Sequence, residues 1–225
     1  MMIAEIPYVL LVGGIIFIGL YASNLLYDRK VPHYISRKIG HFTAGIAFIT
    51  AVLLFSSGWW PLVLAIVFTG LLWTARFVRP SIFRGVGGSG RPTKIMAEVW
   101  FSISTVLIIT FGWILLDEPL VTLTCLLFMA WGDMVTGLIR SQIYHKPVKG
   151  LWGSVGMLTI CSIIGCVLID PIWIGVVGAF VATIVEAITG DTSLIPSLRW
   201  LDDNLSVPLF SALIIFGLLS TRGVI

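Results

Sequence analysis

Long apolar runs separated by short polar connections constrain this chain more than any other feature. Crossing the roughly 30 Å hydrocarbon core of a bilayer takes about 20 apolar residues per helix. Eight runs are long enough or nearly so: 3–24, 41–57, 59–78, 95–116, 120–139, 153–169, 171–189 and 207–221. Because 58% of the residues are hydrophobic and only 11% are charged, the chain cannot supply the polar exterior of a soluble domain.

The sequence therefore predicts an all-α, polytopic membrane protein that forms a single integral membrane domain over residues 1–225. We expect about eight transmembrane helices. The second and sixth runs are short, so the alternative is seven crossings with a tilted, broken or re-entrant segment.

Basic residues gather in alternate connections, and this predicts the orientation. Lys and Arg mark the cytoplasmic side of membrane spans. The odd-numbered connections are therefore expected in the cytoplasm and the N-terminus outside, with the first run acting as an anchor rather than a cleaved signal peptide. The basic residues of these connections are Arg29, Lys30, Arg37, Lys38, Arg76, Arg79, Arg84, Arg91, Lys94, Arg140, Lys146, Lys149 and Arg199.

The first of three polar clusters lies where the second run begins. Arg37 and Lys38 precede His41 by four and three residues, so a helix would present all three on one side. Three such donors suit a phosphate or pyrophosphate. The alternative is that Arg37 and Lys38 only hold the helix end at the lipid head groups. Gly45, one turn further on, keeps this side open for a ligand or a neighbouring helix.

The second cluster begins with Asp133, about two turns inside the end of the fifth run. A carboxylate at that depth needs a partner, which is either Arg140 on the same helical side or a metal ion. Lys149 follows in the next connection. Gly153 and Ser154 then open the sixth run, where a helix N-terminus and a hydroxyl favour an anion.

The third cluster consists of oxygen donors around the end of the seventh run. Magnesium prefers such hard ligands, and usually takes one or two carboxylates together with substrate phosphates and water. The alternative is a solvated turn before Pro208. The donors are Glu186, Asp191, Asp202, Asp203 and Asn204.

A glycine-rich stretch runs from Arg84 to Arg91. Its backbone N–H groups favour a phosphate-binding nest. The alternative is a flexible hinge between two helices.

Taken together, these motifs resemble those of the membrane family of CTP-dependent lipid and polyprenol kinases, which holds dolichol kinase, phytol kinase and the yeast-type diacylglycerol kinase. That family is related to the phosphatidate cytidylyltransferases. The resemblance covers most of residues 37–209 through short motifs in the family's order. The matching segments are Arg37-Lys38-Ile39-Gly40-His41, Gly132-Asp133, Lys149-Gly-Leu-Trp-Gly153-Ser154, Glu186-Ala187 and Asp203-Asn204-Leu205-Ser206-Val207-Pro208-Leu209.

Two positions depart from the family pattern. Trp152 stands where the family has Glu, and Gly150 stands where it has Ser. Any role of the family Glu is therefore missing from this chain or is supplied by another carboxylate, for which Glu98 is a candidate.

The resemblance implies transfer of a phosphoryl group from CTP to the hydroxyl of a membrane lipid or polyprenol, at the cytoplasmic face of a cell inner membrane or an ER-type membrane. The cofactor it implies is Mg²⁺ or another divalent cation. The implied metal ligands are Asp133, Glu186, Asp203 and Asn204. The implied contacts to nucleotide and substrate are Arg37, Lys38, His41, Arg140, Lys149, Gly153, Ser154 and Asn204. The implied catalytic residues are Asp133, His41, Lys149 and Glu186.

Three other functions remain open at this point. A cytidylyltransferase that joins CTP to a lipid phosphate would use the same carboxylates and cations. A transporter for an anionic solute would line a path with them, although such folds commonly have related halves and no repeat is apparent here. A membrane protein without catalysis would serve as a partner. No nucleic-acid motif is present, so we expect no nucleic-acid partner.

Overall fold

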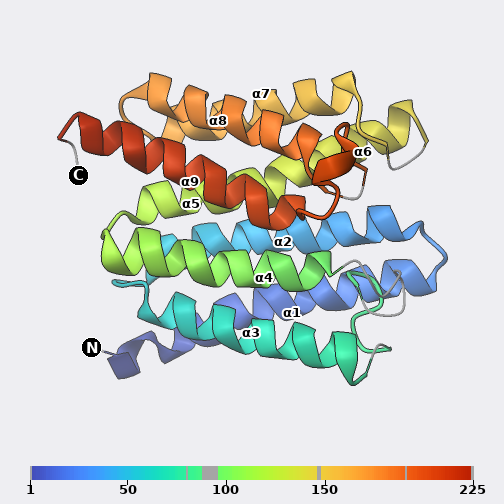
Figure 1. Cartoon of the computed structure of the whole chain (residues 1–225). Coiled ribbons are helices and arrows are strands. Elements are labelled where there is room, and N and C mark those ends of the chain that lie inside the picture. The colour runs from blue at the N-terminus through green and yellow to red at the C-terminus, as the bar shows by residue number, and fades with distance from the viewer. Residues whose placement is uncertain (1, 80, 88–95, 146–147, 191, 224–225) are drawn as a thin grey trace.

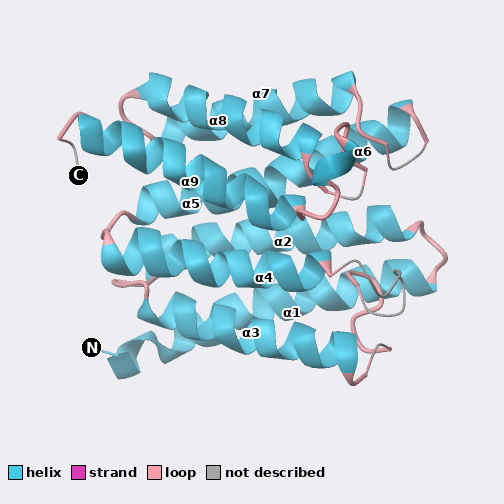
Figure 2. Ribbon diagram, viewed as in Figure 1, coloured by secondary structure: helices cyan, strands magenta, loops and turns pink. Residues whose placement is uncertain are grey.

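A computed structural model shows the chain as a bundle of helices joined by short loops (Figures 1 and 2). The structure describes residues 2–79, 81–87, 96–145, 148–190 and 192–223. No strand occurs within these residues, which agrees with the predicted all-α fold. Lys94, Lys146, Asp191 and the second half of the glycine-rich stretch, residues 88–91, lie outside them.

The helices follow one another with few irregular segments. Two of the long helices contain π-helical turns, and short 3₁₀ helices cover Met2–Glu5 and Pro196–Leu198. The π-helical turns are η3 (Ile109–Leu115) and η4 (Phe128–Gly132). The α-helices are α1 (Ile6–Asp28), α2 (His33–Leu54), α3 (Trp59–Phe77), α4 (Ala97–Ile108), α5 (Pro119–Leu127), α6 (Asp133–Ile143), α7 (Leu151–Leu168), α8 (Ile172–Ile188) and α9 (Asp203–Thr221).

Seven helices in the described part of the chain are long and apolar enough to cross a membrane. Two of them are composite: α4 continues through η3, and α5 continues through η4 into α6. The remaining apolar helix, α8, has 17 residues and is shorter than a typical span. These helices support the prediction of an integral membrane protein. The number of crossings and the orientation stay predictions.

The ends of three helices differ from the predicted apolar runs because charged residues belong to the helices. α2 begins at His33 rather than near residue 41, since Pro32 precedes it and Arg and Lys are good helix formers. α6 extends to Ile143, and α9 begins at Asp203 with Asp202 as its N-cap. Most residues of the polar clusters therefore lie on the ends of helices, whereas Lys149 stays in the connection before α7.

The connections alternate between the two ends of the bundle. Those that follow α1, α3, α6 and α8 lie at one end, and both termini lie at the other (Figure 1). At the terminal end, Oε1 of Glu5 accepts hydrogen bonds of 3.0 and 2.7 Å from the backbone N–H and hydroxyl of Ser56. The basic connections thus share one end, as the sequence predicts.

The interior of the bundle is formed around α5 and η4. Cys125, Phe128 and Ala130 are completely buried there. Large apolar side chains such as Leu53 and Val167 are instead 76% exposed on the outside. Because a hydrocarbon environment tolerates such residues, this outer surface is suited to lipid contact.

Close helix packing fixes the helices that carry the polar clusters. A Cβ at Gly165 would lie 2.6 Å from the backbone oxygen of Gly175, so α7 and α8 approach each other at these two glycines. A Cβ at Gly45 would lie 2.0 Å from Nε1 of Trp131. Gly45 therefore makes room for the neighbouring helix, which was one of its two predicted uses.

Candidate functional site

The three predicted polar clusters meet at the end of the bundle that holds the basic connections. α2 supplies the first cluster, and α6 with the connection before α7 supplies the second. The last turn of α8 and the first turn of α9 supply the third. Four of these residues, Asp133, Glu186, Asp203 and Asn204, line one small cavity with apolar side chains from η4, α7 and α9.

One group of contacts surrounds Asp133, and we call Lys38, His41, Asp133 and Asn204 the Asp133 cluster. Lys38 Nζ donates to Asp133 Oδ2 at 2.7 Å and to the Asp133 backbone oxygen at 2.9 Å. His41 Nε2 lies 3.1 Å from the same Oδ2 and 3.3 Å from Asn204 Oδ1. The carboxylate is thus held by two side chains from α2.

The imidazole of His41 faces oxygen atoms on both sides. Its Nδ1 lies 3.1 Å from the backbone oxygen of Arg37, and its Nε2 faces Asp133 and Asn204. In either tautomer, neither ring nitrogen has a lone pair directed into open space. The geometry therefore favours His41 as a group that orients Asp133. Since His41 has no lone pair free to accept a proton, the alcohol proton of the predicted reaction would pass to a carboxylate.

The second group of contacts surrounds Glu186, and we call Arg140, Lys149, Glu186 and Asp203 the Glu186 cluster. Arg140 donates through Nη1 and Nη2 to the two carboxylate oxygens of Glu186 at 2.9 and 3.0 Å. Lys149 Nζ lies 3.0 Å from Glu186 Oε1 and 3.0 Å from Asp203 Oδ2, and also donates to the backbone oxygen of Glu186. Glu186 is only 1% exposed. Burial alone would lower the pKa of Lys149, but the carboxylates of Asp203 and Glu186 outweigh it and raise that pKa.

The pairing of Asp133 with Arg140, one of the two alternatives from the sequence, is not formed. The two residues lie on the same side of one helix, but seven residues correspond to about 10 Å along its axis. Lys38 and His41 of α2 reach Asp133 instead, and Arg140 turns to Glu186 of α8.

Asp133 and Asp203 each keep one carboxylate oxygen, Oδ1, without a hydrogen bond from the described residues. Their side chains are 20% and 24% exposed, so both carboxylates can be reached from outside. Both oxygens of Glu186 are occupied by cations. Asp133, Asp203 and the amide oxygen of Asn204 are therefore the donors that fit Mg²⁺, whereas Glu186 does not fit in this arrangement. Within the described chain, no three His, Cys, Asp or Glu side chains form a metal site by themselves.

Two other predicted residues are available to an anion. Arg37 is half-buried and forms no ion pair or side-chain hydrogen bond with any described residue. The Ser154 hydroxyl likewise has no partner there, and it lies in the first turns of α7. A guanidinium, a hydroxyl and a helix N-terminus are suitable donors for a phosphate.

Gly153 has a packing part, and its predicted contact to nucleotide or substrate stays a prediction. A Cβ at this position would lie 2.3 Å from Nε of Arg140, so the glycine makes room for the guanidinium. Gly137 does the same for Lys38, since a Cβ there would lie 2.0 Å from Lys38 Cε. Gly137 lies one turn after Asp133 on the same side of α6.

Asp202 was predicted as one of the oxygen donors of the third cluster, and the structure gives it a further part as a helix cap. Its Oδ1 accepts hydrogen bonds from the backbone N–H and the side-chain amide of Asn204, at 3.0 and 2.9 Å. This contact caps α9 and fixes the orientation of Asn204. Burial and the neighbouring carboxylate of Asp203 raise the pKa of Asp202 to about 6.

Both departures from the family pattern lie outside these contacts, and a Cβ at Gly150 would lie 2.9 Å from the ring of Tyr144. Trp152 is 55% exposed at the start of α7. Glu98 is buried on α4, where Arg76 Nη1 donates to its Oε1 at 3.2 Å. Glu98 therefore does not take the place of a carboxylate in either cluster.

Comparisons with known proteins leave the family open. No family model matches the chain, and no curated protein or solved structure shows significant similarity to it. The resemblance to the CTP-dependent lipid kinases rests on the short motifs alone and stays a prediction.

Proposed function

We propose that this protein is a CTP-dependent kinase that transfers a phosphoryl group to the hydroxyl of a membrane lipid or polyprenol. The observation that carries the proposal is the pair of carboxylates Asp133 and Asp203. Each is held in place by a lysine through Oδ2, each has Oδ1 without a partner among the described residues, and both line the same small cavity. Phosphoryl transfer depends mainly on such fixed charges and on positioning.

The proposed reaction makes one bond and breaks one. The lipid oxygen bonds to the γ-phosphorus of CTP, and the bond from that phosphorus to the β,γ-bridging oxygen breaks, so that CDP leaves. Asp133 Oδ1 takes the alcohol proton, while Lys38 and His41 keep the carboxylate in position. An alcohol is proposed as the phosphoryl acceptor rather than water, which agrees with a site on a helical bundle whose outer surface suits lipid.

Because Asp133 Oδ1 takes the proton in this reaction, Asp203 and Asn204 would hold the divalent cation without it, and when bound the cation would neutralise charge on the phosphates. Arg37 and Ser154 are the donors proposed to contact the phosphates directly. Lys149 and Arg140 act through Asp203 and Glu186, because the carboxylates already occupy them. The preference for cytidine is taken from the family resemblance.

The proposal is tested by supplying purified protein and Mg²⁺ with γ-labelled CTP, ATP, GTP or UTP. The acceptors are diacylglycerol, polyprenols, phytol and glycerol ethers. We expect labelled lipid with CTP. Asp133→Asn should lower the rate at least a hundredfold, within the range of about 10²–10⁴ for loss of a general base.

Asp28→Asn is the matched control for the loss of a carboxylate. Asp28 lies at the same end of the bundle, is 49% exposed and pairs with Arg84 at 3.1 Å, so its loss should leave the rate unchanged. Label that enters lipid only from the cytidine moiety would instead establish a cytidylyltransferase. Solute uptake into proteoliposomes without chemical change would establish a transporter, and unaltered cellular function of Asp133→Asn would indicate a non-catalytic partner.

A further inference from the structure

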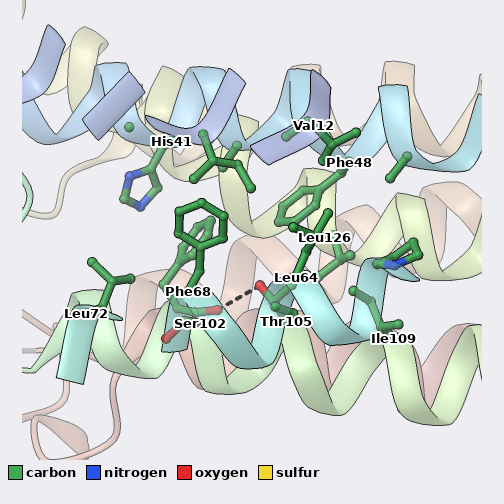
Figure 3. Close-up of a pocket in the computed structure, with 18 of the residues that line it drawn as sticks. Val12, His41, Phe48, Leu64, Phe68, Leu72, Ser102, Thr105, Ile109 and Leu126 are labelled. Carbon is green, nitrogen blue, oxygen red and sulfur yellow. Dashed lines mark hydrogen bonds between the residues drawn. The ribbon is translucent and has the colours of Figure 1, made fainter. Parts of the chain in front are cut away.

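A large apolar cavity lies between α1, α2, α3, α4 and α5, beside the proposed catalytic residues (Figure 3). Its volume is about 1050 Å³, including the part that is open at the surface. Figure 3 shows His41 and Leu72 towards one end and Ile109 towards the other, with Phe48 and Phe68 between them. Most of the side chains along its length are aliphatic or aromatic.

The cavity is long and follows one face of α2. The residues of α2 that line it recur every three or four positions from Arg37 to Val52. At 1.5 Å per residue, these 15 positions correspond to about 22 Å. That is longer than one leaflet of the hydrocarbon core, which is about 15 Å. Small residues along this face, among them Ala44 and Ala47, leave the space open.

The charged and imidazole side chains of the cavity are concentrated at the end nearest the Asp133 cluster, whereas the hydroxyls of Ser102 and Thr105 lie further along it and donate to backbone oxygens (Figure 3). Arg37, His41 and Glu98 lie there. His41 belongs to both regions, because it lines the cavity and its Nε2 contacts Asp133. A molecule with a long apolar part and one hydroxyl would therefore place the hydroxyl next to the carboxylate.

We propose that this cavity binds the hydrocarbon chain of the acceptor alcohol and holds its hydroxyl at His41, beside Asp133. This inference rests on the proposed kinase function for the identity of the ligand. It adds the substrate class, a long-chain membrane alcohol whose chain lies inside the bundle rather than on its outer surface. It also adds the residues that set chain length, which are the small side chains of α2 at increasing distance from His41.

Chain-length selectivity tests the inference directly. Ala44, Ala47 and Ala51 line the cavity about 4.5, 9 and 15 Å beyond His41 along α2. Substituting each with Phe should block the cavity at that depth. We expect the longest alcohol that is phosphorylated efficiently to become shorter in the order Ala51→Phe, Ala47→Phe, Ala44→Phe. Activity towards the shortest alcohols should fall less than threefold in Ala51→Phe.

Leu53→Phe is the matched control. It adds an aromatic ring to the same helix on the lipid-exposed side, so its chain-length profile should equal that of the unmodified protein. A uniform loss of rate at every chain length in the three cavity variants, with each of them folded, would overturn the inference.

A second measurement uses the unmodified protein and does not depend on catalysis. A long-chain alcohol with a photoreactive diazirine in mid-chain should form adducts with cavity residues such as Phe48 and Leu126, and excess unlabelled alcohol should suppress them. Adducts confined to outer residues such as Leu53 and Leu213 would overturn the inference. Cavity adducts without phosphorylated product would refute the kinase and leave the binding site standing. Phosphorylated product without cavity adducts would support the kinase and refute the binding site.

Discussion

Removing the carboxylate of Glu186 should destabilise the protein strongly, because it leaves two buried cations with one anion. In the Glu186 cluster, Arg140 and Lys149 are balanced by Glu186 and Asp203. The side chains of Arg140 and Glu186 are 8% and 1% exposed, so water cannot compensate for the loss. Breaking a buried pair in this way costs about 3–5 kcal/mol. At about 2–4 °C per kcal/mol for a chain of this size, Glu186→Gln should lower Tm by about 6–20 °C.

The assay is thermal unfolding in detergent micelles, carried out as a double-mutant cycle. Arg140→Gln alone leaves one cation with two anions, whereas the double variant Arg140→Gln, Glu186→Gln restores the balance between Lys149 and Asp203. We therefore expect the double variant to be more stable than Glu186→Gln, with a coupling free energy of about 2–3 kcal/mol between the two sites.

An additive result would refute the reasoning, because it would mean that Arg140 and Glu186 do not stabilise each other in the folded protein. Asp28→Asn serves as the reference for an exposed ion pair. Its partner Arg84 is 42% exposed, so the change in the free energy of unfolding should stay below about 1 kcal/mol.

Two further predictions concern a glycine and a pH effect. Gly153→Ala should lower both Tm and the proposed kinase activity, because the added Cβ would displace Arg140. Gly70→Ala is the control, since nothing lies within 4 Å of the added Cβ, and it should leave Tm and activity unchanged. Equal effects of the two substitutions would contradict the prediction. Hydrogen bonds from the Ser56 backbone and hydroxyl lower the pKa of Glu5. The ionised carboxylate therefore contributes stability that is fully present above the ordinary pKa of about 4.3. This stability is lost as the pH falls through the pKa of Glu5 in the folded protein. The Tm difference between the unmodified protein and Glu5→Gln should therefore shrink below about pH 4. A Tm difference that stays constant in unfolding scans from pH 7 to 3 would contradict this role of Glu5.

The helical architecture was predictable because it depends on local composition. Runs of about 20 apolar residues determine helices that suit a membrane, and the alternation of basic connections correctly indicated that the polar clusters share one end of the bundle. The start of α2 was wrong by about eight residues, because hydropathy reports apolar content and Arg37 and Lys38 are charged residues within a helix. Helix formation by such residues leaves no apolar signal.

The pairing within the site was not predictable from spacing along one helix. Arg140 pairs with Glu186, which is 46 residues away in the sequence, and Lys38 pairs with Asp133, which is 95 residues away. Both contacts depend on how separate helices pack. Gly153 illustrates the same limit: its position in a phosphate-binding motif suggested a ligand contact, which stays a prediction, and only the packing of the helices shows that it makes room for Arg140.

The end of α8 explains why the Lys149 and Glu186 motifs form one structural unit. Glu186 lies in the last turn of α8, where the helix dipole is negative and disfavours a carboxylate. Lys149 compensates for both charges, since its ammonium contacts the carboxylate and also the backbone oxygen of Glu186 at the unsatisfied end of the helix. The ammonium position is thus set by where α8 ends. Because the same ammonium holds Asp203 at 3.0 Å, the end of α8 also determines where a carboxylate of the proposed catalytic site lies.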